Sequence, residues 1–104
     1  MAKDTTVRAI VFREGDQLVA QCLEYDIGAQ ASDPETLHER LVMTLYAECM
    51  TRGGSEADPF PGIDPAPEYF QQLWDNCNYE LTPKKAPARL HSKGPSIRMA
   101  LCAA

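Results

Sequence analysis

The sequence predicts an α+β fold, a two-layer sandwich in which an antiparallel β-meander and a C-terminal strand form a sheet covered on one face by one long and one shorter helix. Three observations support this class: apolar alternation between positions 5 and 31, a long helical pattern after Asp33, and renewed alternation over 96–102. The expected element order is therefore β-β-β-α-α-β. At 104 residues the chain is expected to form a single domain, 1–104, with its core in residues 5–52.

The first three elements are predicted strands. Residues 5–13 alternate with period two and carry apolar side chains on both faces, which indicates a central strand. A short turn containing Gly15 then leads into residues 17–24, so the two strands are expected to form an antiparallel hairpin. A third, shorter strand is predicted over 27–31.

The long helix is predicted to begin after Asp33 and to end near Thr51–Arg52. Asp33 is a favourable N-cap, and Pro34 suits the first helical position, where a missing N–H costs nothing. Gly53-Gly54 supplies the stop. Apolar residues recur at three- and four-residue spacing and predict a core-facing stripe of Leu37, Leu41, Val42, Leu45, Tyr46 and Cys49.

The second half of the chain predicts fewer elements. Residues 53–64 are expected to form a loop, and a second helix is predicted from Ala66 to about Asn76, within a helical elaboration spanning 65–77. The proline-bearing stretch 82–95 is expected to be a loop or an extended arm, followed by a last strand at 96–102. That strand needs pairing to stay ordered, either within its own chain or in a neighbouring copy.

Charge is distributed unevenly. Residues 1–83 carry 15 acidic and 5 basic side chains, whereas residues 84–104 carry five basic side chains and no acid, which together give the net charge of −5. An acidic body repels phosphate backbones, so nucleic-acid binding is not expected, and a weak contribution from the basic arm is the alternative. The first residues lack the pattern of a signal peptide, and no apolar run reaches membrane length, so we expect a cytoplasmic protein.

The sequence predicts neither a metal site nor a cofactor site. The four cysteines (Cys22, Cys49, Cys77, Cys102) lie inside apolar patterns, at spacings that fit no zinc motif, and are expected to be small core residues. His38 is expected to be a partly buried or surface helix residue, and His91 an exposed residue of the arm. A metal-dependent nuclease would need Glu24, Asp26 and Glu48 to converge.

The pattern resembles the HicB-like family, the antitoxin half of HicA–HicB pairs. The resemblance lies in the Gly15-Asp16 turn, in the strand Leu18–Glu24, in Gly28–Ala31 leading to Asp33-Pro34-Glu35-Thr36-Leu37, and in the long helix that follows. It covers about residues 6–52. The ribbon-helix-helix or helix-turn-helix unit that many HicB antitoxins carry is not recognisable, so a solitary form is expected.

The resemblance implies a partial RNase H-like fold without catalytic carboxylates, and a protein that binds and occludes a small RNA-cleaving toxin. It also implies self-association. We therefore expect a non-enzymatic interaction module; the nuclease and the nucleic-acid arm are the alternatives. Aromatic and basic residues that could anchor partners give the candidate interaction surface: Phe60, Tyr69, Phe70, Trp74, Lys84, Lys85 and Arg89.

Overall fold

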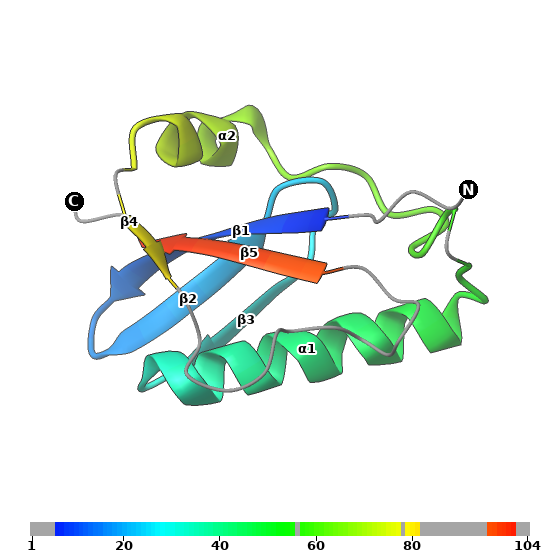
Figure 1. The fold of residues 1–104 in the computed structure, drawn as a ribbon, viewed down its shortest axis with the longest axis horizontal. Helices are drawn as coiled ribbons and strands as arrows, with labels where there is room; N and C mark the ends of the chain where they lie inside the picture. Colours follow the sequence, from blue (N-terminus) through cyan, green and yellow to red (C-terminus); the bar gives the residue numbers. More distant parts are fainter. Residues whose placement is uncertain (1–5, 56, 78, 82–95, 102–104) are drawn as a thin grey trace.

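A computed structural model describes residues 6–55, 57–77, 79–81 and 96–101. The elements are β1 (Thr6–Glu14), β2 (Gln17–Cys22), β3 (Gly28–Ala31), α1 (Pro34–Thr51), α2 (Glu68–Asp75), β4 (Tyr79–Leu81) and β5 (Ser96–Leu101). The strands form a mixed sheet with a helix on either side (Figure 1). The predicted α+β class is confirmed, as is the order β-β-β-α-α-β, to which the structure adds the short strand β4.

The sheet has the strand order β3-β2-β1-β5-β4. The predicted hairpin is present, because β1 and β2 pair antiparallel with Glu14 opposite Gln17 across the Gly15 turn, and Gly15 has a φ of +63°. β5 lies parallel to β1 and antiparallel to β4. In this structure the last strand therefore pairs within its own chain, which is one of the two arrangements that the sequence left open.

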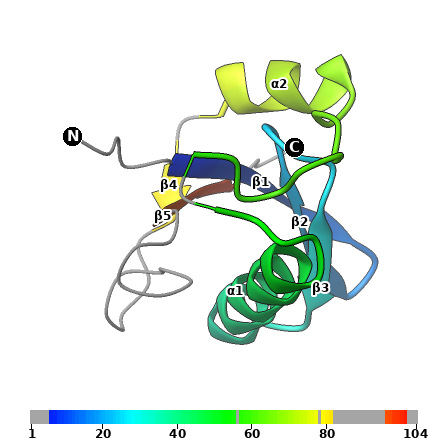
Figure 2. The ribbon, with the colours of Figure 1, turned by 90° about the vertical axis from the view of Figure 1, so that its right-hand side faces the viewer.

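The main hydrophobic core lies between the sheet and α1. Alternate β1 residues, including Val7 and Val11, meet Leu37, Leu41 and Leu45 of the helix. In Figure 2 the helix is seen nearly end-on, beside β2 and β3 and on the side of the sheet opposite α2. The loop after the helix completes this core with Phe60, which packs edge-on against Tyr25 at a ring distance of 4.6 Å.

The second helix lies on the other face of the sheet, so the prediction of a two-layer sandwich with both helices on one face was wrong. A smaller cluster forms there around Ile10, Leu23 and Ala100, and Phe70 and Trp74 of α2 pack against it. The physical reason is that the even-numbered positions of β1 are also partly apolar. A strand with two apolar faces buries both only when each is covered.

The ends of α1 follow the predicted chemistry. Asp33 accepts hydrogen bonds from the backbone N–H and the hydroxyl of Thr36, both at 2.9 Å. These bonds lower the pKa of the Asp33 carboxyl. At the other end Gly53, with a φ of +67°, and Gly54 donate their N–H groups to the carbonyls of Met50 and Cys49 and close a Schellman motif.

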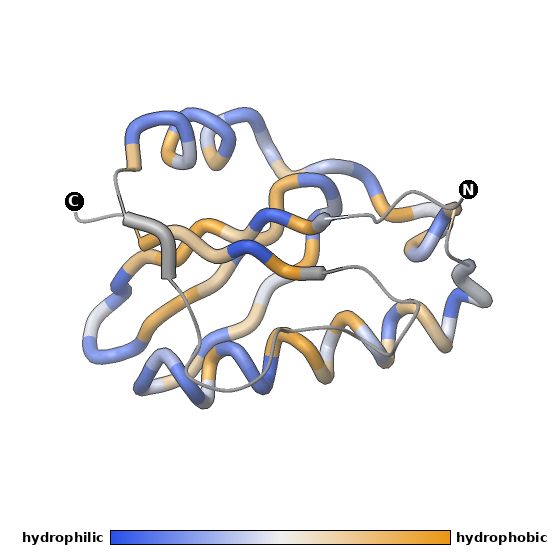
Figure 3. The backbone as a smooth tube through the Cα atoms, in the orientation of Figure 1, coloured by the Kyte–Doolittle hydropathy of each residue, from blue (hydrophilic) through white to orange (hydrophobic). Residues whose placement is uncertain are grey.

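Element boundaries differ from the predictions by a few residues. The second strand ends at Cys22, not Glu24, and the second helix runs over Glu68–Asp75. The predicted arm 82–95 and the end of the last strand at Cys102 lie outside the described residues. Along the backbone in Figure 3 the β1–β2 turn is hydrophilic, whereas the strands alternate. Neither described helix is long and apolar enough to cross a membrane.

Candidate interaction surfaces

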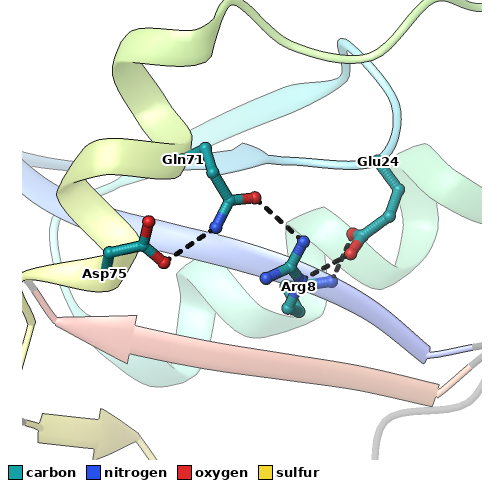
Figure 4. Close-up of polar contacts among 4 residues, drawn as sticks. All are labelled: Arg8, Glu24, Gln71 and Asp75. Carbon is teal, nitrogen blue, oxygen red and sulfur yellow. Dashed lines mark hydrogen bonds and ion pairs between the residues drawn. The ribbon is translucent and has the colours of Figure 1, made fainter.

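A polar network joins the α2 side of the sheet to α2 (Figure 4). The Arg8 side chain, from β1, donates from Nε to Oε2 of Glu24 at 2.6 Å and from Nη2 to Oε1 of Gln71 at 3.0 Å. The Arg8 backbone N–H also donates to Oε1 of Glu24 at 2.7 Å. Gln71 in turn donates to Asp75 at 3.0 Å. Arg8 therefore connects the end of β2 to the helix above.

The guanidinium groups of two adjacent strands meet the ring of Trp74. Arg8 and Arg98 are register partners in the parallel β1–β5 pair, and each guanidinium carbon lies 5.5 Å from the centroid of the indole ring. Cation–π contacts at this distance contribute about 0.5–1 kcal/mol each at exposed sites. Trp74 is half-buried, so the predicted partner residue is also part of the attachment of α2 to the sheet.

The other two aromatic residues of α2 differ in exposure. Phe70 is half-buried and stacks on Phe12 with ring centroids 6.1 Å apart, whereas Tyr69 is 61% exposed and touches Phe70 edge-on at 5.3 Å. Within this predicted aromatic stripe, Tyr69 is the residue whose surface is mostly available to a partner.

Phe60 does not belong to the interaction surface, which corrects its inclusion among the predicted surface residues. It is only 1% exposed and is one of the largest buried side chains. The reason is the close return of its loop to α1, where a Cβ on Gly54 would lie 1.9 Å from the carbonyl oxygen of Pro59. Only glycine permits that approach, and it places Phe60 in the core. The predicted surface residues Lys84, Lys85 and Arg89 lie outside the described residues.

The structure reveals an apolar stripe on the outer side of α1 that the sequence analysis missed. Met43 is 67% exposed, Met50 64% and Tyr46 39%, and Ala47 between them is also exposed. These four residues, hereafter the α1 stripe, recur at i, i+3, i+4 and i+7 and so occupy one face of the helix. Tyr46 had been predicted to face the core. The sequence of α1 contains two apolar stripes at helical spacing, one facing the core and one facing outward. Separating the two would have predicted the exposed stripe.

His38 lies in the buried part of α1, and its Nε2 has no hydrogen-bond partner among the residues that the structure describes. Burial lowers the pKa of the imidazole, and the nearby carboxylates of Glu35 and Glu39 partly oppose that shift. A buried neutral imidazole with an unpaired nitrogen costs stability, since its lost hydrogen bond to water is not replaced.

The described cysteines behave as the sequence predicts for small apolar residues. Cys22 and Cys49 are buried in the main core, and Cys77 packs, half-buried, in the α2 cluster. Burial, followed by the charge of Glu24, raises the pKa of Cys22 to about 12. The Cys22 thiol therefore stays protonated at neutral pH and is a poor nucleophile. Cys102 lies outside the described residues.

The carboxylates that a nuclease would need do not converge. Glu24 pairs with Arg8 on the α2 side, Asp26 accepts from Gln21 at 2.9 Å, and Glu48 pairs with Arg52 on α1, across the sheet from Arg8. Among the residues that the structure describes, there is no group of three or more His, Cys, Asp or Glu side chains placed to hold a metal ion.

Comparisons with models of known protein families, with curated proteins and with solved structures find no match to this chain. Function is therefore inferred from the residues and the surfaces of the chain itself.

Proposed function

We propose that this chain is a non-enzymatic protein-interaction module of the HicB-like kind, with a partial RNase H-like fold, which acts in the cytoplasm. In this proposal it binds and neutralises a small RNA-cleaving toxin, and it self-associates. The observation that carries the proposal is the α1 stripe, in which two methionines are about two-thirds exposed on a helix whose other side is fully buried.

An apolar stripe of this kind favours a protein partner. Isolated exposed apolar residues are common, but four at helical spacing form a continuous surface whose burial is favourable. Methionine side chains are flexible and adapt to irregular partner surfaces. Tyrosine is among the residues that most often anchor interfaces.

The charge of the molecule favours a basic partner. The full chain carries 15 acidic and 10 basic side chains, a net charge of −5, and residues 1–83 hold all of the acidic side chains but only five of the basic ones. On α1 itself, Glu48 is paired with Arg52, and Arg40 donates to the carbonyl oxygen of Gln30. A small basic protein with an apolar ridge would therefore be attracted over a distance and then bury the α1 stripe.

The test is a pull-down of the tagged chain from its native cell extract, with eluted proteins identified and the mass of the complex measured by light scattering. We expect a small basic protein in a fixed ratio, bound more weakly as salt screens the attraction. The partner then enters a toxicity rescue assay.

A matched pair of variants connects that result to α1. The double variant Met43→Gln, Met50→Gln makes the stripe polar at similar size and helix propensity. Thr51→Gln, the control, introduces a glutamine at an exposed α1 position outside the stripe without removing an apolar side chain. We expect the double variant to lose the partner and Thr51→Gln to keep it. A wild-type chain that stays monomeric and retains no protein contradicts the proposal.

A further inference from the structure

We propose that Met43 and Met50 form a modification site, at which oxidation to methionine sulfoxide by a peroxide makes the α1 stripe polar and releases its partner. The release of a partner rests on the proposed function, whereas the oxidation and the change in surface polarity do not. The basis is the placement of two exposed thioethers on one face of α1 that points away from the main core.

The methionines of this chain differ sharply in their access to solvent. Met43 is 67% exposed and Met50 64%, whereas Met99 in β5 is 3% exposed and lies in the main core. A dissolved oxidant reaches the first two directly, but it reaches Met99 only when the sheet opens. The fold therefore makes the two stripe methionines reactive and protects Met99. Met1 lies outside the described residues.

The reaction is an oxygen transfer in which the sulfur loses two electrons. A lone pair of the thioether sulfur attacks one oxygen of hydrogen peroxide, so an S–O bond forms and the O–O bond breaks. The proton on the transferred oxygen passes to the departing hydroxide, which leaves as water, and the peroxide is thereby reduced. The product is an uncharged but polar sulfoxide, which methionine sulfoxide reductases convert back to the thioether.

The position of the two residues confines the effect of oxidation to the surface of the molecule. Met43 and Met50 are seven positions apart, about two helical turns, so they lie on one line with Tyr46 and Ala47 between them. Both sulfoxide oxygens therefore enter the same stripe, and each must lose its bound water when an apolar partner covers it. The core-facing leucines of α1 carry no thioether and keep their packing. Oxidation should therefore remove binding and preserve the fold.

The first test is peroxide oxidation of the native full chain, followed by trypsin digestion and mass spectrometry. Cleavage at arginine places both stripe methionines in the peptide 41–52 and Met99 in the peptide 99–104. We expect each stripe methionine to gain one oxygen at least about tenfold faster than Met99. Fragment spectra distinguish these oxygens from oxidation of Cys49, which is buried in the core. In concentrated urea, where the chain is unfolded, the three rates should become equal.

The second test examines the surface without a partner. We expect the oxidised chain to leave a hydrophobic-interaction column earlier than the untreated chain, and repair by methionine sulfoxide reductases to restore the retention. The urea midpoint should be unchanged by oxidation. The matched control is the double variant Met43→Leu, Met50→Leu, which keeps the stripe apolar at similar size and helix propensity but has no thioether there. Peroxide should leave the retention of this variant unchanged.

The third test is the pull-down, with the native, the oxidised and the repaired chain as bait. Two sulfoxide oxygens without hydrogen-bond partners in an apolar interface should weaken binding at least about tenfold. We therefore expect the partner to be lost on oxidation and recovered on repair. The leucine double variant should keep the partner before and after peroxide treatment.

Two results would overturn the proposal. If Met43 and Met50 gain oxygen no faster than Met99 in the native chain, the fold provides no selective site. If the oxidised chain keeps the column retention or the partner of the untreated chain, oxidation does not change the stripe. An untreated chain that captures no partner contradicts the proposed function, and with it the release, whereas the peptide masses and the column still decide whether the modification site exists.

Discussion

The two faces of the sheet are covered by helices that differ greatly in how much of their side-chain surface they bury against it. On one face, α1 buries Leu37, Leu41 and Leu45 completely and is capped at both ends. On the other, α2 buries none of its side chains and is held by a polar network, two cation–π contacts and half-buried aromatics. The sheet is therefore packed against a deeply buried helix on one face and against a helix with only half-buried contacts on the other.

Because of this difference, the residues that stabilise the fold are largely not the residues that are exposed to a partner. Burial of apolar area is the main source of folding free energy, and most of it lies on the α1 face. The exposed apolar residues, in contrast, lie on the outer sides of both helices, with Met43 and Met50 on α1 and Tyr69 on α2. Substitutions should therefore divide into those that unfold the chain and those that change only its surfaces.

The largest expected effect comes from comparing one leucine on each helix. Leu41→Ala on α1 should lower the free energy of unfolding by roughly 2–5 kcal/mol, because it leaves a cavity in the main core. Leu73→Ala on α2 should cost about 1 kcal/mol, since that side chain is only half-buried. Urea unfolding followed by circular dichroism measures both. Equal losses in the free energy of unfolding would mean that the two helices contribute equally to the stability of the fold.

The next effect is expected where the loop returns to α1. Gly54→Ala would place a Cβ 1.9 Å from the carbonyl oxygen of Pro59, so the loop that carries Phe60 must shift, at a cost of roughly 2–3 kcal/mol. Gly53→Ala is the control, because its Cβ meets nothing within 4 Å and only the positive φ is strained, at about 1 kcal/mol. Thermal unfolding of the two variants should rank them in that order.

These glycines show how far the sequence could predict the fold. The caps, the turn and the hairpin follow from local chemistry at Asp33, Gly15 and Gly53, and they were predicted. The close approach at Gly54, which buries Phe60, depends on where a distant loop returns, and no local pattern encodes it. The three-residue strand β4 is too short to show a period.

The placement of α2 and the outward stripe of α1 were missed for different reasons. The apolar residues on both faces of the first strand were visible, yet which helix covers which face is set by tertiary packing. On α1, Tyr46 was assigned to the core because it follows Val42 at four-residue spacing, although Val42 itself is only half-buried at the margin of the core stripe. Met43, Tyr46 and Met50 are separated from the core stripe only when every apolar residue of the helix is assigned to one of its two faces.

A smaller effect is expected from His38, and it depends on pH. His38→Leu should raise the free energy of unfolding by about 1 kcal/mol at pH 7.5, because it removes a buried Nε2 for which the described part of the chain offers no hydrogen-bond partner. The stability advantage of His38→Leu over the wild type should increase as the pH is lowered. Burial lowers the folded pKa below the unfolded value of about 6.5, so the unfolded chain takes up the proton first, and stability is lost as pH falls through the folded pKa.

The measurement for His38 is the difference in urea midpoint between wild type and His38→Leu at pH 7.5 and at pH 5.5. The carboxylates are common to both chains, so their titration cancels in the difference. His38→Gln, which keeps a polar group in the same place, serves as the control. A gain that is independent of pH would mean that His38 does not change its charge on unfolding.

The smallest effect on stability is expected at the α1 stripe, and its smallness is informative. Met43 and Met50 are about two-thirds exposed, so replacing both with glutamine should change the free energy of unfolding by no more than about 0.5 kcal/mol. Thr51→Gln should behave alike. Urea unfolding of the isolated chain measures this. A loss as large as that of Leu73→Ala would mean that the methionines support the fold, and loss of a partner by that variant could then be due to unfolding. A neutral result assigns such a loss to the surface itself.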